Sequence, residues 1–256
     1  MLTLGGNETV SLEATAKTIL GDSDSLELPG RQNELVEKVV RLGKPTVAVL
    51  INGKPYAIEQ LKQKVPAILD GWYLGEETGT AIADVLFGDV NPPGHLPVTI
   101  ARNVGQLPVY YYKTPAARRG CVLDSNEPLF PFGFGLSYTT FSFDKPAADH
   151  ESISPTGTAI VSVIVKNTGS RAGDEVVQMY VHHDVASVVQ PTIALRGFKR
   201  IHLEPDHSTT VRFEVGPQAL SIVNSEMRRV VEPGPVEIMI GPDSTQTSSV
   251  KLVVSE

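Results

Sequence analysis

Two hydrophobic periodicities alternate along residues 30–100. In "RQNELVEKVVRLGKP", the apolar residues from Leu35 to Val40 recur at helical spacing, which predicts a helix with one apolar face. "TVAVLI" follows as a continuous apolar run, which is typical of a central parallel strand covered on both sides. The same order repeats through "AIEQLKQK", "PAILDGWY", "EETGTAIADVLFG" and "LPVTI". Alternation of strand and helix predicts βαβ crossovers and a mostly parallel sheet with flanking helices, a partial α/β sandwich domain over residues 1–100.

The first residues of the chain extend this pattern. "MLTL" is interpreted as the last part of a strand of the same sheet, and "GGNE" as the loop that leaves its carboxyl end. Ligands of open α/β sheets bind beyond the carboxyl ends of the strands. A ligand site is therefore expected in "GGNETVSLEATAKTILGDSDSLELPGRQ", residues 5–32, a stretch that holds five carboxylates.

The pattern changes twice after residue 100. Residues 101–150 are irregular and rich in Pro, Gly and aromatic side chains, which predicts a connecting segment packed on the α/β domain. From residue 151 onward, short alternating strands follow at regular spacing without helices, as in "AIVSVIVKN", "EVVQMYVHH" and "VEIMIG". Such spacing predicts a β-sandwich of immunoglobulin or fibronectin type III kind over residues 151–256.

Composition narrows the classes of function. The chain has 256 residues, enough for two domains, and its 41% hydrophobic and 20% charged residues are ordinary globular values. No apolar run approaches the roughly 20 residues of a membrane-spanning helix. A net charge of -7 without a block of Lys or Arg argues against a nucleic-acid partner. The N-terminus has no signal-peptide pattern, so the cellular compartment stays unknown.

Metal and thiol chemistry find little support in the residues. Cys121 is the single cysteine and has no partner for a disulfide or a CxxC site. His182 and His183 are neighbours on a predicted strand and point to opposite faces. Asp22 and Asp24 lack the late glutamate of an EF-hand, so helix capping and turn formation are favoured. We expect no metal site and no cofactor.

Several blocks together resemble one enzyme family. The segments "LPGRQNELVEKVVRLGKPTVAVLINGKP", "AILDGWYLGEETGTAIADVLFGDVNPPGHLPVTI", "PLFPFGFGLSYTTF" and "NTGSRAGDEVVQMYV" closely resemble the C-terminal part of glycoside hydrolase family 3 enzymes, the β-glucosidases and β-xylosidases. The resemblance implies a three-part architecture: an N-terminal barrel, an α/β sandwich domain and a fibronectin type III-like domain. This sequence resembles the last two parts, so a complementary barrel domain or chain is an expected partner.

The resemblance also implies a chemistry and two candidate residues. Retaining hydrolysis of terminal β-linked glucose or xylose uses two carboxyl groups about 5 Å apart. In this family an aspartate nucleophile comes from the barrel, and a glutamate on a loop of the α/β domain is the general acid/base. Glu13 in "SLEAT" is the first choice for that glutamate by its place ahead of the "LPG" block, and Glu8 in "GGNE" is the second.

Trp72 and Tyr73 follow a predicted strand in "DGWYLG" and are candidates for sugar contacts, with core packing as the alternative.

Without a barrel the chain is expected to be inactive and to expose a sheet edge, which favours self-association into a homo-oligomer. The rival interpretation is a non-catalytic module, derived from such an enzyme, that binds carbohydrate or a protein.

Overall fold

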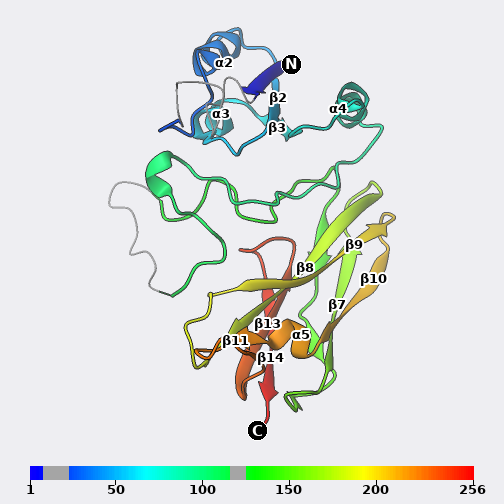
Figure 1. The fold of residues 1–256 in the computed structure, drawn as a ribbon. Helices are drawn as coiled ribbons and strands as arrows, with labels where there is room; N and C mark the ends of the chain where they lie inside the picture. The colour runs from blue at the N-terminus through cyan, green and yellow to red at the C-terminus, as the bar shows by residue number, and fades with distance from the viewer. Residues whose placement is uncertain (8–22, 116–124) are drawn as a thin grey trace. The chain divides into compact units, whose positions relative to one another are not determined.

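The structure of the chain is a computed structural model that describes residues 1–7, 23–115 and 125–256 (Figure 1). It divides into two compact units. The first unit contains the described residues of 1–90, 98–109 and 121–130, and the second contains those of 91–97, 110–120 and 131–256.

The first unit is built on a three-stranded parallel sheet with the order β1-β2-β3. The strands are β1 (Leu2–Gly6), β2 (Val47–Asn52) and β3 (Ala67–Asp70). The central strand carries Val49 and Leu50, which are 1% and 2% exposed. Because successive strand residues point to opposite faces, both faces of β2 are covered. This confirms the predicted central parallel strand.

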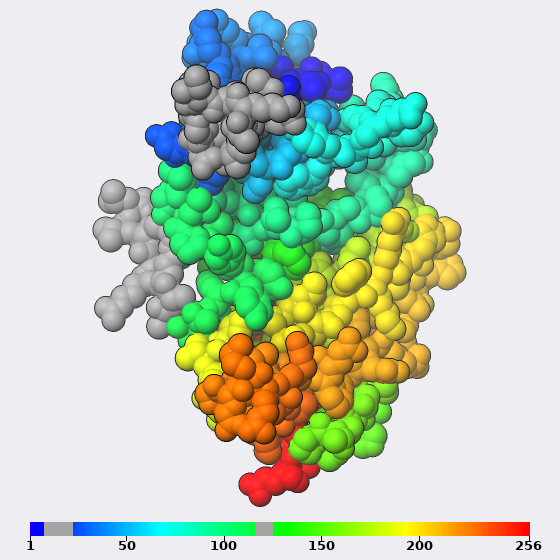
Figure 2. Space-filling model, in the orientation of Figure 1, coloured from blue at the N-terminus to red at the C-terminus, as the bar shows by residue number. Residues whose placement is uncertain are grey.

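Helices accompany the sheet in the predicted order. They are α2 (Gln32–Val40), α3 (Glu59–Lys64) and α4 (Thr78–Phe87). α2 buries Val36 and α3 buries Leu61, whereas α4 has no buried residue and lies on the surface in Figure 2. α4 ends before Gly88, as its sequence predicts. The partial α/β sandwich is therefore confirmed as the fold class of this region.

The predicted strand over "LPVTI", residues 96–100, is wrong. Ile100 makes only an isolated antiparallel bridge with Phe130, and its N–H donates to the Phe130 carbonyl oxygen at 2.9 Å. Pro97 lacks the N–H that a paired strand needs. A single turn of 3₁₀ helix, η1 (Val104–Gln106), follows.

The second unit is a β-sandwich. One sheet has the order β10-β7-β4 with β5 also pairing β7, and the other has the order β6-β14-β13-β8-β9. The longer strands of the two sheets are β7 (Ala159–Asn167), β8 (Gly173–His183), β9 (Ala194–Leu203), β10 (Ser208–Val215), β13 (Gly234–Gly241) and β14 (Ser248–Val254). The shorter ones are β4 (Phe141–Phe143), β5 (Ala147–Ala148) and β6 (Ser152–Ile153), and a separate pair joins β11 (Ile222–Val223) to β12 (Arg229–Val230).

Alternate residues of the two sheets share one core. Val161, Val163 and Val165 of β7 belong to the same hydrophobic cluster as Ile238 and Ile240 of β13. This arrangement confirms the predicted fibronectin type III-like sandwich. One short helix, α5 (Pro217–Leu220), was not expected; its first residue is Pro, which suits the first turn of a helix.

Candidate functional site

Three chain segments meet at one edge of the parallel sheet in the first unit. Parallel strands end on the same side, so the segments that follow β1, β2 and β3 leave from a common edge. We call this the carboxyl edge and define it by Gly5–Asn7, Asn52–Gly53 and Asp70–Tyr73. Residues 8–22 follow Asn7 directly in the sequence.

The end of β1 can be built only with glycine at position 5. Gly5 has a φ of 126°, and a Cβ there would lie 2.0 Å from the carbonyl oxygen of Ile51. The side-chain amide of Gln32 forms hydrogen bonds with both the N–H and the carbonyl oxygen of Gly5. The Gly5 N–H donates to Gln32 Oε1 at 2.7 Å, and Gln32 Nε2 donates to the Gly5 carbonyl oxygen at 2.7 Å.

Tyr73 links the end of β3 to the end of β1. Its hydroxyl donates to the carbonyl oxygen of Gly6 at 2.7 Å. To reach Gly6, the ring crosses the end of β2 at Gly53, where a Cβ would lie 2.6 Å from ring atom Cε2. The side chain nevertheless remains 57% exposed. One ring thus spans all three segments of the carboxyl edge.

Trp72 occupies a tight turn beside Asp70. Its φ of 50° places it in the left-handed region, which is unusual for a bulky residue. The Trp72 N–H donates to Asp70 Oδ1 at 3.3 Å, and this bond stabilises the turn. Burial raises the pKa of Asp70 above its ordinary value, against the opposing effect of the Trp72 N–H.

Asn52 is the buried polar residue of the carboxyl edge. It is 1% exposed, and its Nδ2 donates to the carbonyl oxygen of Lys54 at 2.9 Å. Its Oδ1 is buried and has no hydrogen-bond partner among the residues that the structure describes. Buried polar atoms are normally satisfied, so this oxygen is an available acceptor at the sheet edge.

The predicted site residues divide into two groups. Glu13 and Glu8 lie outside the described residues, so their assignment as acid/base stays a prediction. Trp72 and Tyr73 lie at the carboxyl edge, with Tyr73 bonded to Gly6, and their roles as sugar contacts also stay predictions. Cys121 lies outside the described residues as well.

Sequence reasoning did not single out Gln32 or Asn52. Gln32 contributes through a partner that lies 27 positions away, and Asn52 is distinguished by its burial, and neither property is visible in the local sequence pattern. The available signals were the "LPGRQ" block, where Gln32 begins α2, and the place of Asn52 at the end of a buried strand.

Within the described ranges, no group of three or more His, Cys, Asp or Glu side chains is arranged to hold a metal ion. In those ranges, too, no helix has the length and apolar character to cross a bilayer.

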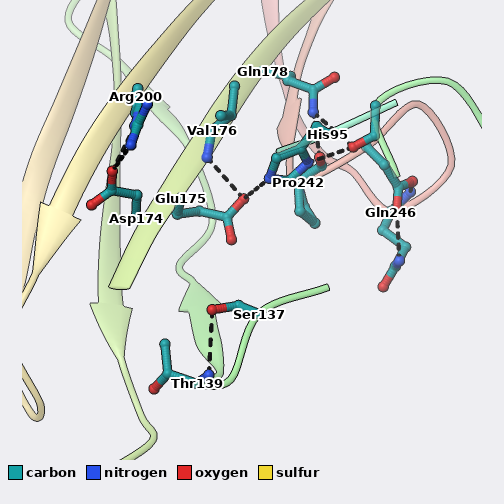
Figure 3. Close-up of polar contacts among 12 residues, drawn as sticks. His95, Ser137, Thr139, Asp174, Glu175, Val176, Gln178, Arg200, Pro242 and Gln246 are labelled. Atoms are coloured by element: carbon teal, nitrogen blue, oxygen red, sulfur yellow. Dashed lines mark hydrogen bonds and ion pairs between the residues drawn. The ribbon is translucent and has the colours of Figure 1, made fainter. Parts of the chain in front are cut away.

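A second polar cluster belongs to the second unit (Figure 3). Glu175 on β8 faces His95, with Oε1 and Nε2 3.6 Å apart, and both side chains are nearly buried. His95 Nδ1 lies 2.6 Å from the carbonyl oxygen of Gly133, which can only accept, so Nδ1 carries a hydrogen. Gln178, three positions further along β8, donates to the carbonyl oxygens of Gly133 and Pro242.

Burial is the main cause of the shifted pKa of Glu175. It raises the pKa of the carboxyl group to about 7, the nearby Asp243 carboxylate adds to the rise, and the N–H of Val176 opposes it. Asp243 is itself fully engaged by the backbone and side chains of Thr245 and Gln246. The cluster fixes loops of the second unit around the start of β8 and contains no part of the carboxyl edge.

Comparison with known proteins identifies the same two kinds of domain as the structure. Residues 2–138 match the family model of the glycosyl hydrolase family 3 C-terminal domain, and residues 175–244 match that of the fibronectin type III-like domain. A β-xylosidase of Formosa agariphila is 49% identical over 228 residues, covering 88% of this chain and 32% of the relative. A periplasmic β-glucosidase of Salmonella typhimurium is 38% identical over 254 residues, covering 95% of this chain and 32% of the relative.

Solved structures give the same result. A β-glucosidase from Erythrobacter marinus superposes with a TM-score of 0.95 at 48% identity, over 98% of this chain and 34% of that one. A β-glucosidase from Listeria innocua in complex with glucose superposes with a TM-score of 0.91 at 30% identity, over 100% of this chain and 36% of that one. The chain thus spans about a third of the length of the relatives it matches. Fold, order of domains and sequence agree, and the chain belongs to glycosyl hydrolase family 3, as its C-terminal region.

Proposed function

We propose that this chain supplies the general acid/base of a retaining β-glycosidase that hydrolyses terminal β-linked glucose or xylose. Glu13 is the proposed acid/base, with Glu8 as the second choice. In the first step the protonated carboxyl gives its proton to the leaving glycosidic oxygen while an aspartate attacks the anomeric carbon. In the second step the same group, now a carboxylate, takes a proton from the water that releases the sugar.

The carboxyl edge is the observation that carries this proposal. The stretch with Glu8 and Glu13 follows β1, and Gly5–Asn7, Asn52–Gly53 and Asp70–Tyr73 end together there. Sheets of this class bind ligands at that edge. The relatives' names, β-xylosidase and β-glucosidase, support glucose or xylose as the sugar.

Aromatic side chains at the same edge support binding of a sugar. Tyr73 is held by Gly6 through its hydroxyl, yet the residue is 57% exposed. Trp72 is fixed in its turn by Asp70. We propose that one or both rings face the substrate, since an apolar ring face packs well on the C–H face of a sugar.

The aspartate nucleophile would come from a barrel domain that this sequence does not include. The exposure of α4 is evidence that the first unit binds a partner. Phe87 at the end of this helix is 85% exposed, and none of the helix residues is buried. Contiguous exposed apolar surface marks interaction sites, and the apolar side chains of α4 would contribute to such a surface. The barrel is the partner we propose for it.

The test combines the chain with a family 3 barrel domain and follows hydrolysis of aryl β-glucosides and β-xylosides. Glu13→Gln should lower kcat for substrates with poor leaving groups by about 10²–10⁴-fold, the usual contribution of general acid/base catalysis. With an activated aryl glycoside, whose leaving group needs no proton, the second step limits kcat in this variant, and added azide should restore part of kcat because the anion needs no base to attack the glycosyl intermediate. The matched change Glu8→Gln should have little effect.

Two other results would redirect the proposal. A large effect at Glu8 with none at Glu13 would move the role to Glu8. Binding of glucose, xylose or cello-oligosaccharides in calorimetry, with no turnover alone or with a barrel, would contradict catalysis and favour a non-catalytic carbohydrate-binding module.

A further inference from the structure

One side chain connects the two described segments on either side of residues 8–22. Gln32 Nε2 donates to the carbonyl oxygen of Gly5 at 2.7 Å and to that of Pro29 at 3.1 Å, while Oε1 accepts from the Gly5 N–H at 2.7 Å. Gly5 precedes the stretch with Glu8 and Glu13, and Pro29 follows it. A single half-buried amide therefore bridges the entry to that stretch and its exit.

The match between Gln32 and Gly5 is chemically specific. A primary amide offers one acceptor and two donors, and here all of these groups are used on backbone partners. The acceptor meets the Gly5 N–H, and the donors meet two carbonyl oxygens. Gln32 is the first residue of α2, so the helix fixes the position from which the amide reaches out.

Two further bonds hold the same entry and exit. The Tyr73 hydroxyl donates to the Gly6 carbonyl oxygen at 2.7 Å, next to the Gln32 contact. On the exit side, the N–H of Ala57 donates to the carbonyl oxygen of Leu26 at 2.7 Å. Of these anchors, Gln32 alone touches both sides.

We propose that Gln32 is a positioning residue for the acid/base glutamate, acting by fixing both ends of the stretch that carries it. The inference rests on the proposed function above. A general acid must lie within hydrogen-bond reach of the leaving oxygen, and a misplacement of about 1 Å can cost on the order of 10²-fold in rate. Loss of the bridge at Gln32 should therefore weaken proton transfer more than sugar binding.

Two variants at this position separate the parts of the bridge. Gln32→Ala removes all three hydrogen bonds. Gln32→Glu keeps an acceptor for the Gly5 N–H but replaces both donors with a carboxylate facing two carbonyl oxygens, so it should be at least as damaging. Gln63→Ala on α3 is the matched control, because Gln63 is exposed and makes none of these three hydrogen bonds.

The readout is kcat/KM of the chain combined with a family 3 barrel, on two glycosides of one sugar. An alkyl glycoside needs protonation of its leaving oxygen, whereas a 2,4-dinitrophenyl glycoside does not.

We expect both Gln32 variants to lower kcat/KM for the alkyl glycoside by about 10–100-fold and to change it by less than about threefold for the dinitrophenyl glycoside. Gln63→Ala should match the unmodified protein on both. Faster amide exchange at Gly5 in Gln32→Ala, which lacks the acceptor for this N–H, with an unchanged far-UV spectrum, should accompany the loss.

The possible failures are distinguishable. An equal loss on both glycosides, or no loss on either, would overturn the positioning role while the dependence on Glu13 or Glu8 stood. If neither glutamate variant affects the alkyl glycoside, or if the unmodified combination has no turnover, the proposed function itself is contradicted, and the inference with it.

Discussion

Gly53 and Tyr73 show how a residue without a side chain can support a contact made by another. The Tyr73 ring lies where a Cβ at Gly53 would be, with Cε2 at 2.6 Å, and its hydroxyl donates to Gly6 at 2.7 Å. The ring can move toward solvent, since the residue is 57% exposed. An added methyl group should therefore displace the ring rather than disrupt the sheet.

We expect Gly53→Ala and Tyr73→Phe to cost similar free energies of unfolding, about 0.5–1.5 kcal/mol each, because each removes the same hydrogen bond to Gly6. The double variant should cost little more than either single one, because both changes act on one contact. Urea unfolding of the four proteins measures this cycle. Gly79→Ala in α4, where a Cβ meets nothing within 4 Å, is the control and should be neutral or stabilising. Additive losses would contradict the shared contact.

Glu175 makes the stability of the second unit depend on pH. In the folded chain its pKa is about 7, against 4.5 for an unperturbed glutamate, because the carboxyl group is buried. The folded state therefore holds a proton that the unfolded state releases as the pH rises above 4.5. The contribution of Glu175 to the free energy of unfolding is fully present below pH 4.5 and is lost as the pH rises to about 7. The total loss is on the order of 3 kcal/mol, since each unit of difference between the two pKa values corresponds to about 1.4 kcal/mol.

Glu175→Gln should remove this pH dependence, since the neutral amide keeps an oxygen for the Val176 N–H. Above pH 7 the variant should be more stable than the unmodified chain by up to a few kcal/mol. Urea unfolding between pH 4 and pH 8 measures the effect. Glu151→Gln, at an exposed position of the same unit, is the control and should leave the pH profile unchanged. A variant with an unaltered slope would contradict the role of Glu175.

At the scale of elements, α3 and α4 differ in what holds them. α3 buries Leu61 to 1% exposure, whereas α4 has no buried residue and ends in Phe87, which is 85% exposed. Helices of this length gain most of their stability from packing of one apolar face. The apolar residues of α4 therefore suit contact with a partner.

Phe87→Ser should change the free energy of unfolding of the chain by less than about 0.5 kcal/mol, as for other exposed positions. Leu61→Ala should cost about 2–5 kcal/mol, because it leaves a cavity. Thermal or urea unfolding compares the two. With a barrel domain present, Phe87→Ser should weaken association, measured by calorimetry or by analytical ultracentrifugation. Loss of stability at Phe87 comparable with that at Leu61 would show that α4 packs within its own unit.

At the scale of the whole molecule, catalysis by a retaining glycosidase needs two carboxyl groups, and the proposal assigns one of them to this chain. The isolated chain should therefore hydrolyse aryl β-glycosides negligibly, and addition of a family 3 barrel domain with its aspartate should raise turnover above that of either part. Release of nitrophenol measures both states. Vigorous hydrolysis by the chain alone would contradict the proposed division of the carboxyl groups.

The boundaries at residues 100 and 150 stay predictions. They rest on changes of sequence pattern, whereas the compact units are defined by contacts, and short pieces such as 91–97 cluster with residues far away in the sequence. Limited proteolysis of the chain would locate the flexible joints directly.

The sequence by itself determined the fold class, the family and the order of elements. Periodicity is local, so β2, α2 and the strands β7 and β13 could be predicted from residues within each segment. "LPVTI" was predicted as a strand and failed, because its apolar pattern carries no information on whether a neighbour is present to pair with it.

Only the tertiary structure decided which residues act together. Gln32 meets Gly5 across 27 positions, Tyr73 meets Gly6 across 67, and Gln178 meets Gly133 across 45. The raised pKa of Glu175 likewise comes from burial, which no pattern around "GDEVV" reports. Local spacing specifies elements because each element forms its own backbone geometry, whereas these contacts exist only after distant segments have packed.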